Sequence, residues 1–142
     1  MIKQLSIFVE NKPGRLAEVT RAIGDAGVDL RALSIADTSD FGILRLIVNK
    51  PQEAVDALKK AGLTVSLTDV LAVGINDAPG AFADVVQLLT DNGIVLEYMY
   101  AFISRCEKQA VIILRIEELE RAISVLRQRN VRLLSEEEVY RM

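Results

Sequence analysis

The stretch VENKPGRLAEV, residues 9–19, places a Pro-Gly pair between a strand-like run and a helix-like run. At an offset of 66 residues the chain repeats this arrangement as INDAPGAFADV, residues 75–85. Further on, an offset of 68 aligns AVDAL, residues 54–58, with AISVL, residues 122–126. A nearly constant period of this kind indicates two copies of one structural unit.

We therefore predict two domains, residues 1–69 and 70–142, with the same order of strands and helices. In the first domain, residues 3–9 form a strand, and Pro13 takes the first position of a helix, where its missing N–H costs nothing. Two strands joined by a hairpin loop, a helix opened by Pro51 and a final strand complete the domain. This order, βαββαβ, is the ferredoxin-like α+β unit, an antiparallel sheet with both helices on one face.

Three local patterns refine this fold. The alternation of apolar and polar residues shifts by one position between Leu30 and Leu33, which predicts a β-bulge or a doubly buried strand. Ser135 and Glu138 have the spacing of a capping box, so a helical turn near residue 142 is expected to shorten the last strand of the second domain. The strands GILRLIV and AVIILRI are nearly continuous apolar runs, typical of strands buried on both faces. Because the helices of a domain cover only one face of its sheet, we predict a homodimer.

Composition excludes several classes of function. The 142 residues are 51% hydrophobic and carry a net charge of −3, with one cysteine and no histidine. No apolar run reaches the roughly 20 residues of a membrane span, and no basic stripe points to nucleic acid. Without histidine, the chain lacks the commonest general base and metal ligand. We expect no cofactor, no metal and no catalytic residues, no membrane or nucleic-acid partner, and a cytoplasmic location.

The duplicated unit has NKPG and NDAPG after its first strand, and GVDL and GIVL after its first helix. In these features it resembles the ACT domain, and the resemblance covers essentially the whole chain as two ACT copies. It implies a regulatory fold that binds a free amino acid between paired domains. Such domains are fused to enzymes of amino-acid metabolism or work beside them as separate subunits, and a tandem of this size is similar to the second arrangement.

The resemblance also implies particular ligand-binding positions. In the serine-sensing ACT domains of phosphoglycerate dehydrogenase, an Asn in the first strand–helix loop and a polar residue after the first helix hold the ligand. By position these are Asn11 and Asp29 in the first copy, and Asp77 and Val95 in the second. Val95 departs from the pattern, so the two copies are not expected to form equivalent polar sites. If domains pair side by side, Asp77 would face Asp29, and Asn11 would face Val95.

The chemistry of a free amino acid fits these loops without the family. Its carboxylate needs convergent N–H donors, which a helix N-terminus supplies through the amides of residues 14–16 and 80–82. Glycine after proline leaves the main chain open to a ligand, and aspartate or asparagine accepts from the ammonium. The candidate ligand-binding residues are Asn11, Pro13, Gly14, Arg15, Leu16, Asp29, Leu30, Asn76, Asp77, Ala78, Gly80, Ala81 and Phe82.

Five of these candidates also have a purely structural explanation. Asn11 and Asp77 suit turns and helix caps. Gly14 and Gly80 suit close packing of a helix on a strand. Asp29 suits a solvated strand start.

Other distinctive residues favour structural roles. Tyr98, Tyr100 and Phe102 alternate along one strand and are interpreted as core or dimer packing rather than a ligand-side wall. Cys106, in a predicted hairpin loop, is interpreted as a bystander thiol. The segment RQRNVR, residues 127–132, is interpreted as a solvated helix end favoured by the helix dipole.

The leading hypothesis is a non-catalytic regulatory protein whose amino-acid effector acts on an enzyme of amino-acid metabolism. The alternative is a structural or assembly subunit with no ligand of its own, which Val95 favours. An enzyme on this fold would need an acid/base pair or a nucleophile in a cleft, and the sequence has no motif for either. The ligand, the regulated enzyme and the location of sites within the chain or across a dimer stay open.

Overall fold

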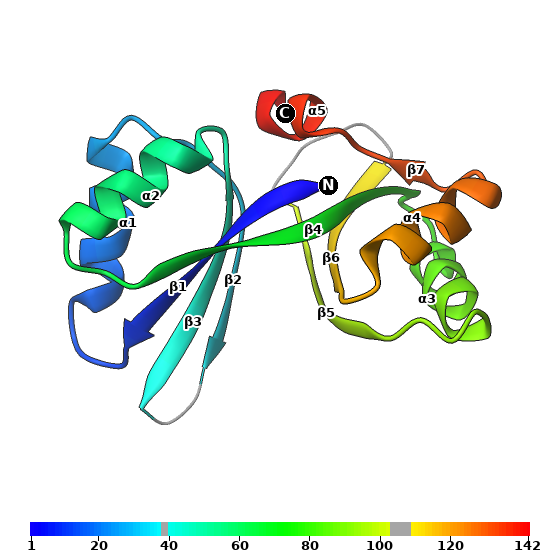
Figure 1. Ribbon diagram of the computed structural model, residues 1–142, viewed down its shortest axis with the longest axis horizontal. Coiled ribbons are helices and arrows are strands. Elements are labelled where there is room, and N and C mark those ends of the chain that lie inside the picture. Colours follow the sequence, from blue (N-terminus) through cyan, green and yellow to red (C-terminus); the bar gives the residue numbers. More distant parts are fainter. Residues whose placement is uncertain (38–39, 103–108) are drawn as a thin grey trace. The chain divides into compact units, whose positions relative to one another are not determined.

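A computed structural model describes residues 1–37, 40–102 and 109–142, so Cys106 lies outside the described residues. Strands and helices follow one another along the chain in the order of Figure 1. The elements are β1 (Ile2–Glu10), α1 (Arg15–Asp25), β2 (Leu30–Asp37), β3 (Phe41–Val48), α2 (Pro51–Lys60), β4 (Val65–Asn76), α3 (Ala81–Asp91), β5 (Leu96–Ala101), β6 (Gln109–Ile116), α4 (Leu119–Gln128), β7 (Arg132–Leu133) and α5 (Glu136–Arg141).

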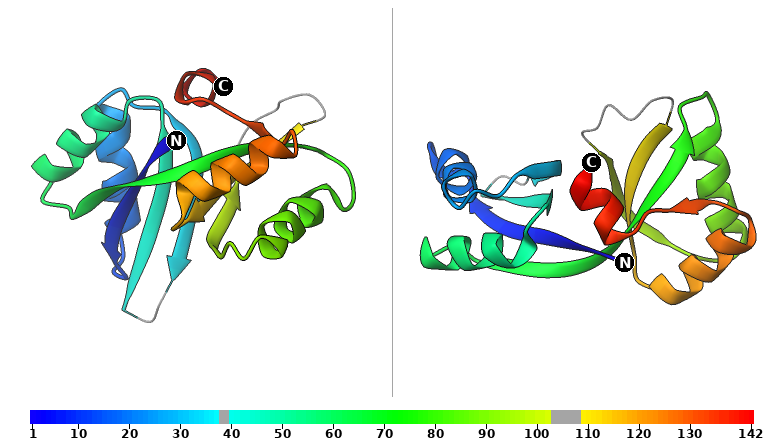
Figure 2. Two further views of the ribbon diagram at one scale, coloured as in Figure 1. Left: turned by 45° about the vertical axis from the view of Figure 1, so that its right-hand side comes forward. Right: turned by 90° about the horizontal axis from the view of Figure 1, so that it is seen from above.

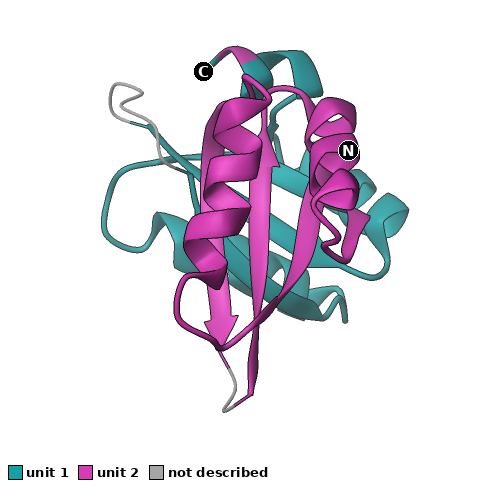
Figure 3. Cartoon of the chain, turned by 90° about the vertical axis from the view of Figure 1, so that its left-hand side faces the viewer, with its two compact units in different colours: residues 1–2, 69–140, 142 teal, residues 3–68, 141 magenta. Residues whose placement is uncertain are grey.

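The chain divides into two compact units (Figure 3). The N-terminal unit, magenta in Figure 3, comprises residues 3–68 and Arg141. The C-terminal unit, teal, comprises residues 1–2, 69–140 and 142. The two repeats of the sequence therefore correspond to two units of structure.

The N-terminal unit is a βαββαβ fold with the strand order β2-β3-β1-β4. Its β1–β3 and β2–β3 pairs are antiparallel, with Leu5 opposite Leu46. Helices α1 and α2 lie on one face of the sheet (Figures 1 and 2). Between the sheet and the helices, a core of buried aliphatic side chains includes Val19, Leu46 and Leu58.

The C-terminal unit repeats this topology. Its strands follow the order β7-β4-β6-β5, and the pairs β4–β6, β5–β6 and β4–β7 are antiparallel. Leu71 lies opposite Leu114, the positions equivalent to Leu5 and Leu46 in the first repeat. Helices α3 and α4 complete the core through residues such as Leu89. The predicted pair of antiparallel α+β units is confirmed.

Strand β4 belongs to both units. Its residues 65–68 lie in the N-terminal unit and its residues 69–76 in the C-terminal unit, and together they form one strand of 12 residues. The sequence pattern predicts a last strand at residues 63–67 but not its continuation. No Gly or Pro occurs between Val65 and Val73, so no turn signal divides the two repeats.

Several local predictions are confirmed. The register of β2 against β3 shifts between Leu30 and Ala32, which is the predicted bulge. Pro51 occupies the first turn of α2. The last strand of the second copy, β7, has only 2 residues.

The predicted capping box at the start of α5 is also present. The Glu138 amide donates to Ser135 Oγ at 3.2 Å, and the Ser135 amide donates to Glu138 Oε2 at 2.8 Å. The hydrogen bond from the Ser135 backbone, followed by that from Arg132, holds the pKa of the Glu138 carboxyl below its ordinary value.

Candidate functional site

Each Pro-Gly pair forms a tight turn that leads into a helix. In the first Pro-Gly loop (residues 10–16), the Lys12 carbonyl accepts from the Arg15 amide at 3.2 Å. Gly14 has φ 85° and ψ −10°. Proline at the second position and a left-handed glycine at the third define a type II turn. Helix α1 then begins at Arg15 with Gly14 as its N-cap, so the prediction that Pro13 takes the first helical position is wrong.

The second Pro-Gly loop (residues 76–82) repeats this backbone closely. The Ala78 carbonyl accepts from the Ala81 amide at 3.2 Å, and Gly80 has φ 86° and ψ −12°. In sequence, Pro79 suits both a helix start and a type II turn. The turn forms because the following glycine adopts the positive φ that its third position requires.

The two glycines are required by the backbone and not by packing. A Cβ added at Gly14 or at Gly80 meets no described atom within 4 Å. The packing explanation is therefore wrong for both positions. Positive φ accounts for the residue type, since other residues adopt it at a cost of about 1–2 kcal/mol. The space beside each glycine leaves the main chain open to a small molecule.

The N-termini of α1 and α3 lack side-chain caps among the described residues. Asn11 and Asp77 are therefore not N-caps, and the capping explanation for them is wrong. The amides of Arg15 and Ala81 already donate within their turns, so they are poor donors for a ligand. Among the predicted donors this leaves the amides of the glycines and those at the second helical position, residues 16 and 82, to face a ligand.

Ion pairs surround the first Pro-Gly loop. Lys12 Nζ lies 2.9 Å from Glu10 Oε2, and Arg15 Nη1 lies 3.0 Å from Glu18 Oε2. The second guanidinium nitrogen of Arg15 lies 3.9 Å from Glu10. The hydrogen bond from Lys12 is the main reason that the pKa of the Glu10 carboxyl lies below its ordinary value. Both cations of the loop are thus paired with carboxylates.

A cavity of about 170 Å³ adjoins the first Pro-Gly loop. Its lining includes the candidates Asn11 and Leu16, together with Ile35 and Asp37 from β2. This volume falls below the roughly 300–1,000 Å³ of a typical ligand pocket. A wider hollow of about 600 Å³ begins at Gly14 and runs along α1.

A cavity of about 370 Å³ adjoins the second Pro-Gly loop. Its lining includes the candidates Asn76 and Ala81, and also Asp84, Gln109 and Arg132. The guanidinium of Arg132 donates to Gln109 Oε1 and, at 3.2 Å, to Glu138 Oε1. Asp84, Gln109 and Arg132 were not among the predicted site residues.

The interpretation of residues 127–132 as a solvated helix end is wrong for Arg132. Helix α4 ends at Gln128, and Asn130 has φ 58°. Asparagine in this left-handed conformation is a helix stop, so Arg132 falls on β7 instead. Asn130 was the sequence signal that marks this boundary.

Asp29 and Leu30 lie at the opposite end of α1 from the first Pro-Gly loop. A helix of 11 residues spans about 16 Å, so the two groups cannot form one site within the N-terminal unit. The Asp29 amide donates to Asn49 Oδ1 at 2.9 Å, and its carboxylate pairs with Arg31 Nη1 at 2.9 Å. The Asp29 side chain is 65% exposed, as the explanation by a solvated strand start expects.

Val95 and the three aromatic residues of the β5 region were also singled out in the sequence. Val95, the residue equivalent to Asp29, is 73% exposed. Tyr100 and Phe102 are buried, as the packing interpretation expects, whereas Tyr98 is partly buried.

Among the described residues, no helix is long and apolar enough to cross a membrane.

Comparisons with known proteins place the chain in a family. The ACT domain pair matches residues 1–142. A Bacteroides thetaiotaomicron protein of known crystal structure is 41% identical, with 99% of this chain and 96% of that chain covered and a TM-score of 0.93. No match was found among the curated proteins.

More distant solved structures share the fold. The regulatory subunit of aspartate kinase from Thermus thermophilus has 22% identity over 89% of this chain and 91% of its own, with a TM-score of 0.66. The corresponding subunit from Thermus flavus has 20% identity over 89% and 90%, with a TM-score of 0.62. By its duplicated fold and by the match over its whole length, this chain belongs to the ACT domain pair family.

Proposed function

We propose that this protein is a non-catalytic regulatory protein that binds a free amino acid between ACT units and signals to an enzyme of amino-acid metabolism. The observation that carries the proposal is the duplicated type II turn, which twice presents a helix N-terminus without a side-chain cap among the described residues. Membership of the ACT domain pair family supports it. Two relatives in fold are regulatory subunits of aspartate kinase.

The chemistry of the loops matches the two charges of an amino acid. The ligand carboxylate is held by the helix N-terminal amides near Gly14 or Gly80, where the positive end of the helix dipole favours an anion. The ligand ammonium is held by Asn11, Asp77 or Asp29. The remaining candidates, residues 13, 15, 16, 30, 76, 78, 81 and 82, shape the surrounding surface.

A ligand that touches two ACT units favours the arrangement in which both contacts are made. This coupling is the basis of the proposed signal to a partner enzyme. We further propose a homodimer in the cytoplasm. Leu33 and Ile35, on the edge strand β2, are 43% and 51% exposed, and a partner subunit would bury them. The absence of histidine from the sequence favours a role without catalysis.

A structural or assembly subunit without a ligand is the second candidate function. Two observations favour it: the carboxylate of Asp29 already pairs with Arg31, and the equivalent position in the second repeat is the apolar Val95. If this function is the correct one, the Pro-Gly turns serve only to start helices.

Thermal unfolding of the purified protein against each common amino acid at millimolar concentration distinguishes the two functions. A ligand at 100 times its dissociation constant raises the free energy of unfolding by about 2.7 kcal/mol. For a chain of this length each kcal/mol shifts the melting temperature by about 2–4 °C. A shift with one chemical class of amino acid, absent with the matching amine that lacks the carboxylate, supports the sensor. Folded protein that shifts with none of them points to the assembly subunit.

A further inference from the structure

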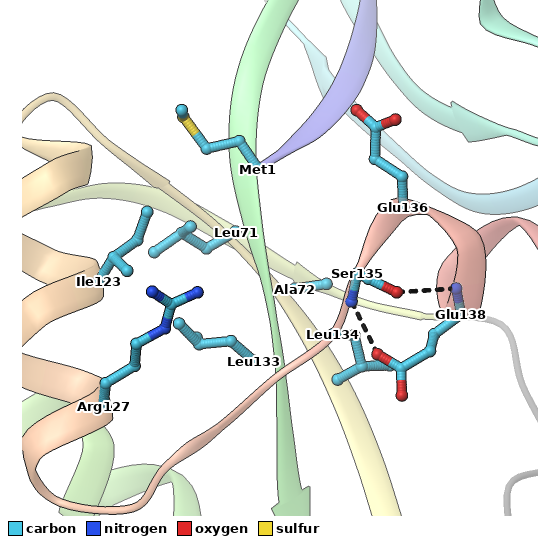
Figure 4. A pocket seen from close by; sticks show the side chains of 10 residues that line it. All are labelled: Met1, Leu71, Ala72, Ile123, Arg127, Leu133, Leu134, Ser135, Glu136 and Glu138. Atoms are coloured by element: carbon cyan, nitrogen blue, oxygen red, sulfur yellow. Dashed lines mark hydrogen bonds between the residues drawn. The ribbon is translucent and has the colours of Figure 1, made fainter.

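A second cavity in the C-terminal unit has no place in the proposed amino-acid site. It has a volume of about 370 Å³ and lies between α4 and the segment that joins β7 to α5 (Figure 4). None of the thirteen candidate ligand-binding residues lines it. Its volume is within the range of small-molecule sites.

One side of this cavity is apolar. Leu71 from β4, Ile123 from α4 and Leu133 from β7 contribute side chains to its lining (Figure 4). Leu71 is buried, whereas Ile123 and Leu133 remain partly exposed. Each further CH₂ group buried against such a surface contributes about 0.8 kcal/mol. A ligand with a short aliphatic body would gain from contact with these side chains.

The cavity is also lined by one basic side chain, that of Arg127. Arg127 projects from α4 beside Ile123 (Figure 4), and within residues 1–37, 40–102 and 109–142 its guanidinium makes no hydrogen bond or ion pair. Three other arginines of this unit each pair with a carboxylate: Arg115 with Glu97 at 3.2 Å, Arg121 with Glu118 at 3.3 Å and Arg132 with Glu138 at 3.2 Å.

Neither of the two acidic residues that line the cavity, Glu136 and Glu138, pairs with Arg127. Glu138 also lines the cavity, but its carboxylate is held by the Ser135 amide and by Arg132. Arg127 stands in the last turn of α4, where the helix dipole favours a cation. The dipole explains a positive charge at this position, but it does not explain why that charge lies beside the apolar side of a cavity.

We infer that this cavity is an accessory binding site for a small monocarboxylate with a short branched aliphatic body. Arg127 donates two parallel hydrogen bonds to the carboxylate, as a guanidinium does to a planar anion. Leu71, Ile123 and Leu133 contact the aliphatic body. A ligand with two or more negative charges is disfavoured, because Glu136 and Glu138 also line the cavity. The inference is independent of the amino-acid site proposed above.

Calorimetric titration of the full chain with 4-methylpentanoate tests this site, together with mapping of amide chemical shifts. We expect saturable binding in the millimolar range, with shift changes at Ile123, Leu133 and Ser135. Arg127→Gln is expected to weaken binding about 10-fold or more, since it removes a charge-assisted hydrogen bond. Arg129→Gln is the matched control, because it removes the same charge two residues along at a position that does not line the cavity.

4-Methylpentylamine, which carries a positive charge in place of the carboxylate, is expected not to bind. The inference is overturned if folded protein shows no saturable binding of 4-methylpentanoate. It is equally overturned if Arg127→Gln weakens binding less than the expected factor, if Arg129→Gln weakens it as much, or if the amine binds as well as the acid. Shift changes confined to the Pro-Gly loops would also overturn it, because they would place the acid at the other site.

Discussion

The two Pro-Gly loops share one backbone and differ in almost every polar side chain. Their glycines have φ 85° and 86°, and their turn hydrogen bonds are both 3.2 Å long. Yet Glu10, Lys12 and Arg15 of the first loop are replaced by Asn76, Ala78 and Ala81 in the second. What the duplication has kept is the presentation of the main chain.

This difference between the two loops indicates which of their atoms could bind a ligand in the same way. Ion pairs link the charged side chains of the first loop, whereas the second loop has a single charged side chain, Asp77, and Arg132 lines the cavity beside it. A ligand that used both loops in the same way would have to bind the backbone. Side chains would then make the two half-sites unequal, with more charged groups at the first loop than at the second.

The largest expected effect is the loss of stability on removing a core side chain, away from the Pro-Gly loops. Leu46→Ala and Leu114→Ala remove equivalent side chains that are 1% and 0% exposed, and each is expected to lower the free energy of unfolding by about 2–5 kcal/mol. Urea denaturation of the two variants measures this. A cost below 1 kcal/mol in either unit would show that its core is not packed as described.

The next effect concerns the ligand. In Leu16→Glu, a carboxylate at the second position of α1 interacts with the N-terminal amides and competes with the ligand. We expect the stabilisation by the amino acid, about 2.7 kcal/mol at 100 times the dissociation constant, to be largely lost. Phe82→Glu makes the same change in the second loop, and thermal unfolding with and without ligand compares the two.

The matched controls are Leu16→Gln and Phe82→Gln, which change shape without adding charge. If only one of the two Glu variants loses the response, that loop holds the ligand carboxylate. If both keep the response in full, neither helix N-terminus binds the carboxylate, and this part of the proposal fails.

A smaller effect tests whether the two turns are equivalent. Gly14→Val and Gly80→Val force a β-branched residue into positive φ, and each is expected to cost at least about 1–2 kcal/mol in free energy of unfolding. Neither variant can therefore separate binding from folding. Gly24→Ala, at a helical glycine with open space around it, is the control and is expected to stabilise α1 by about 0.5–1 kcal/mol. Clearly unequal costs at the two turns would contradict their equivalence.

The smallest effect is the pH response of the first loop. Because Lys12 holds the pKa of Glu10 below its ordinary value, ionised Glu10 favours the folded loop above the pKa of the unfolded chain. This contribution disappears as the pH falls through the lower, folded pKa. Lys12→Ala is expected to raise the Glu10 pKa, measured by carbon NMR of the carboxyl group. An unchanged pKa would mean that the ion pair is not formed in solution.

Much of the fold was predictable because its signals are local. The repeated Pro-Gly pairs and the apolar periodicity specify two βαββαβ units, and the shift in alternation after Leu30 specifies the bulge. The continuity of β4 was missed because the predicted boundary between the repeats, after residue 69, falls within it, although no Gly or Pro interrupts residues 65–73.

The site was predictable only in part. The positions of Gly14 and Gly80 in the loops were identified, but the reason for them was not, since a type II turn and a helix start use the same Pro-Gly pair. Arg132 and Gln109 reach the second loop from β7 and β6. Contacts made through strand pairing between distant segments leave no mark in local sequence, and the same holds for Arg127 and its cavity.

The shared strand β4 fixes the length of the junction between the repeats. A one-residue insertion or deletion within residues 65–76 would turn every following side chain of the strand to the opposite face of the sheet. Evolution can therefore lengthen the chain in hairpin loops but not at this junction. The sequence agrees: the repeat offset is 66 residues across the junction and becomes 68 only past the β5–β6 connection. For protein engineering, a flexible linker or an inserted domain belongs in that connection, and the boundary between the repeats is the place to avoid.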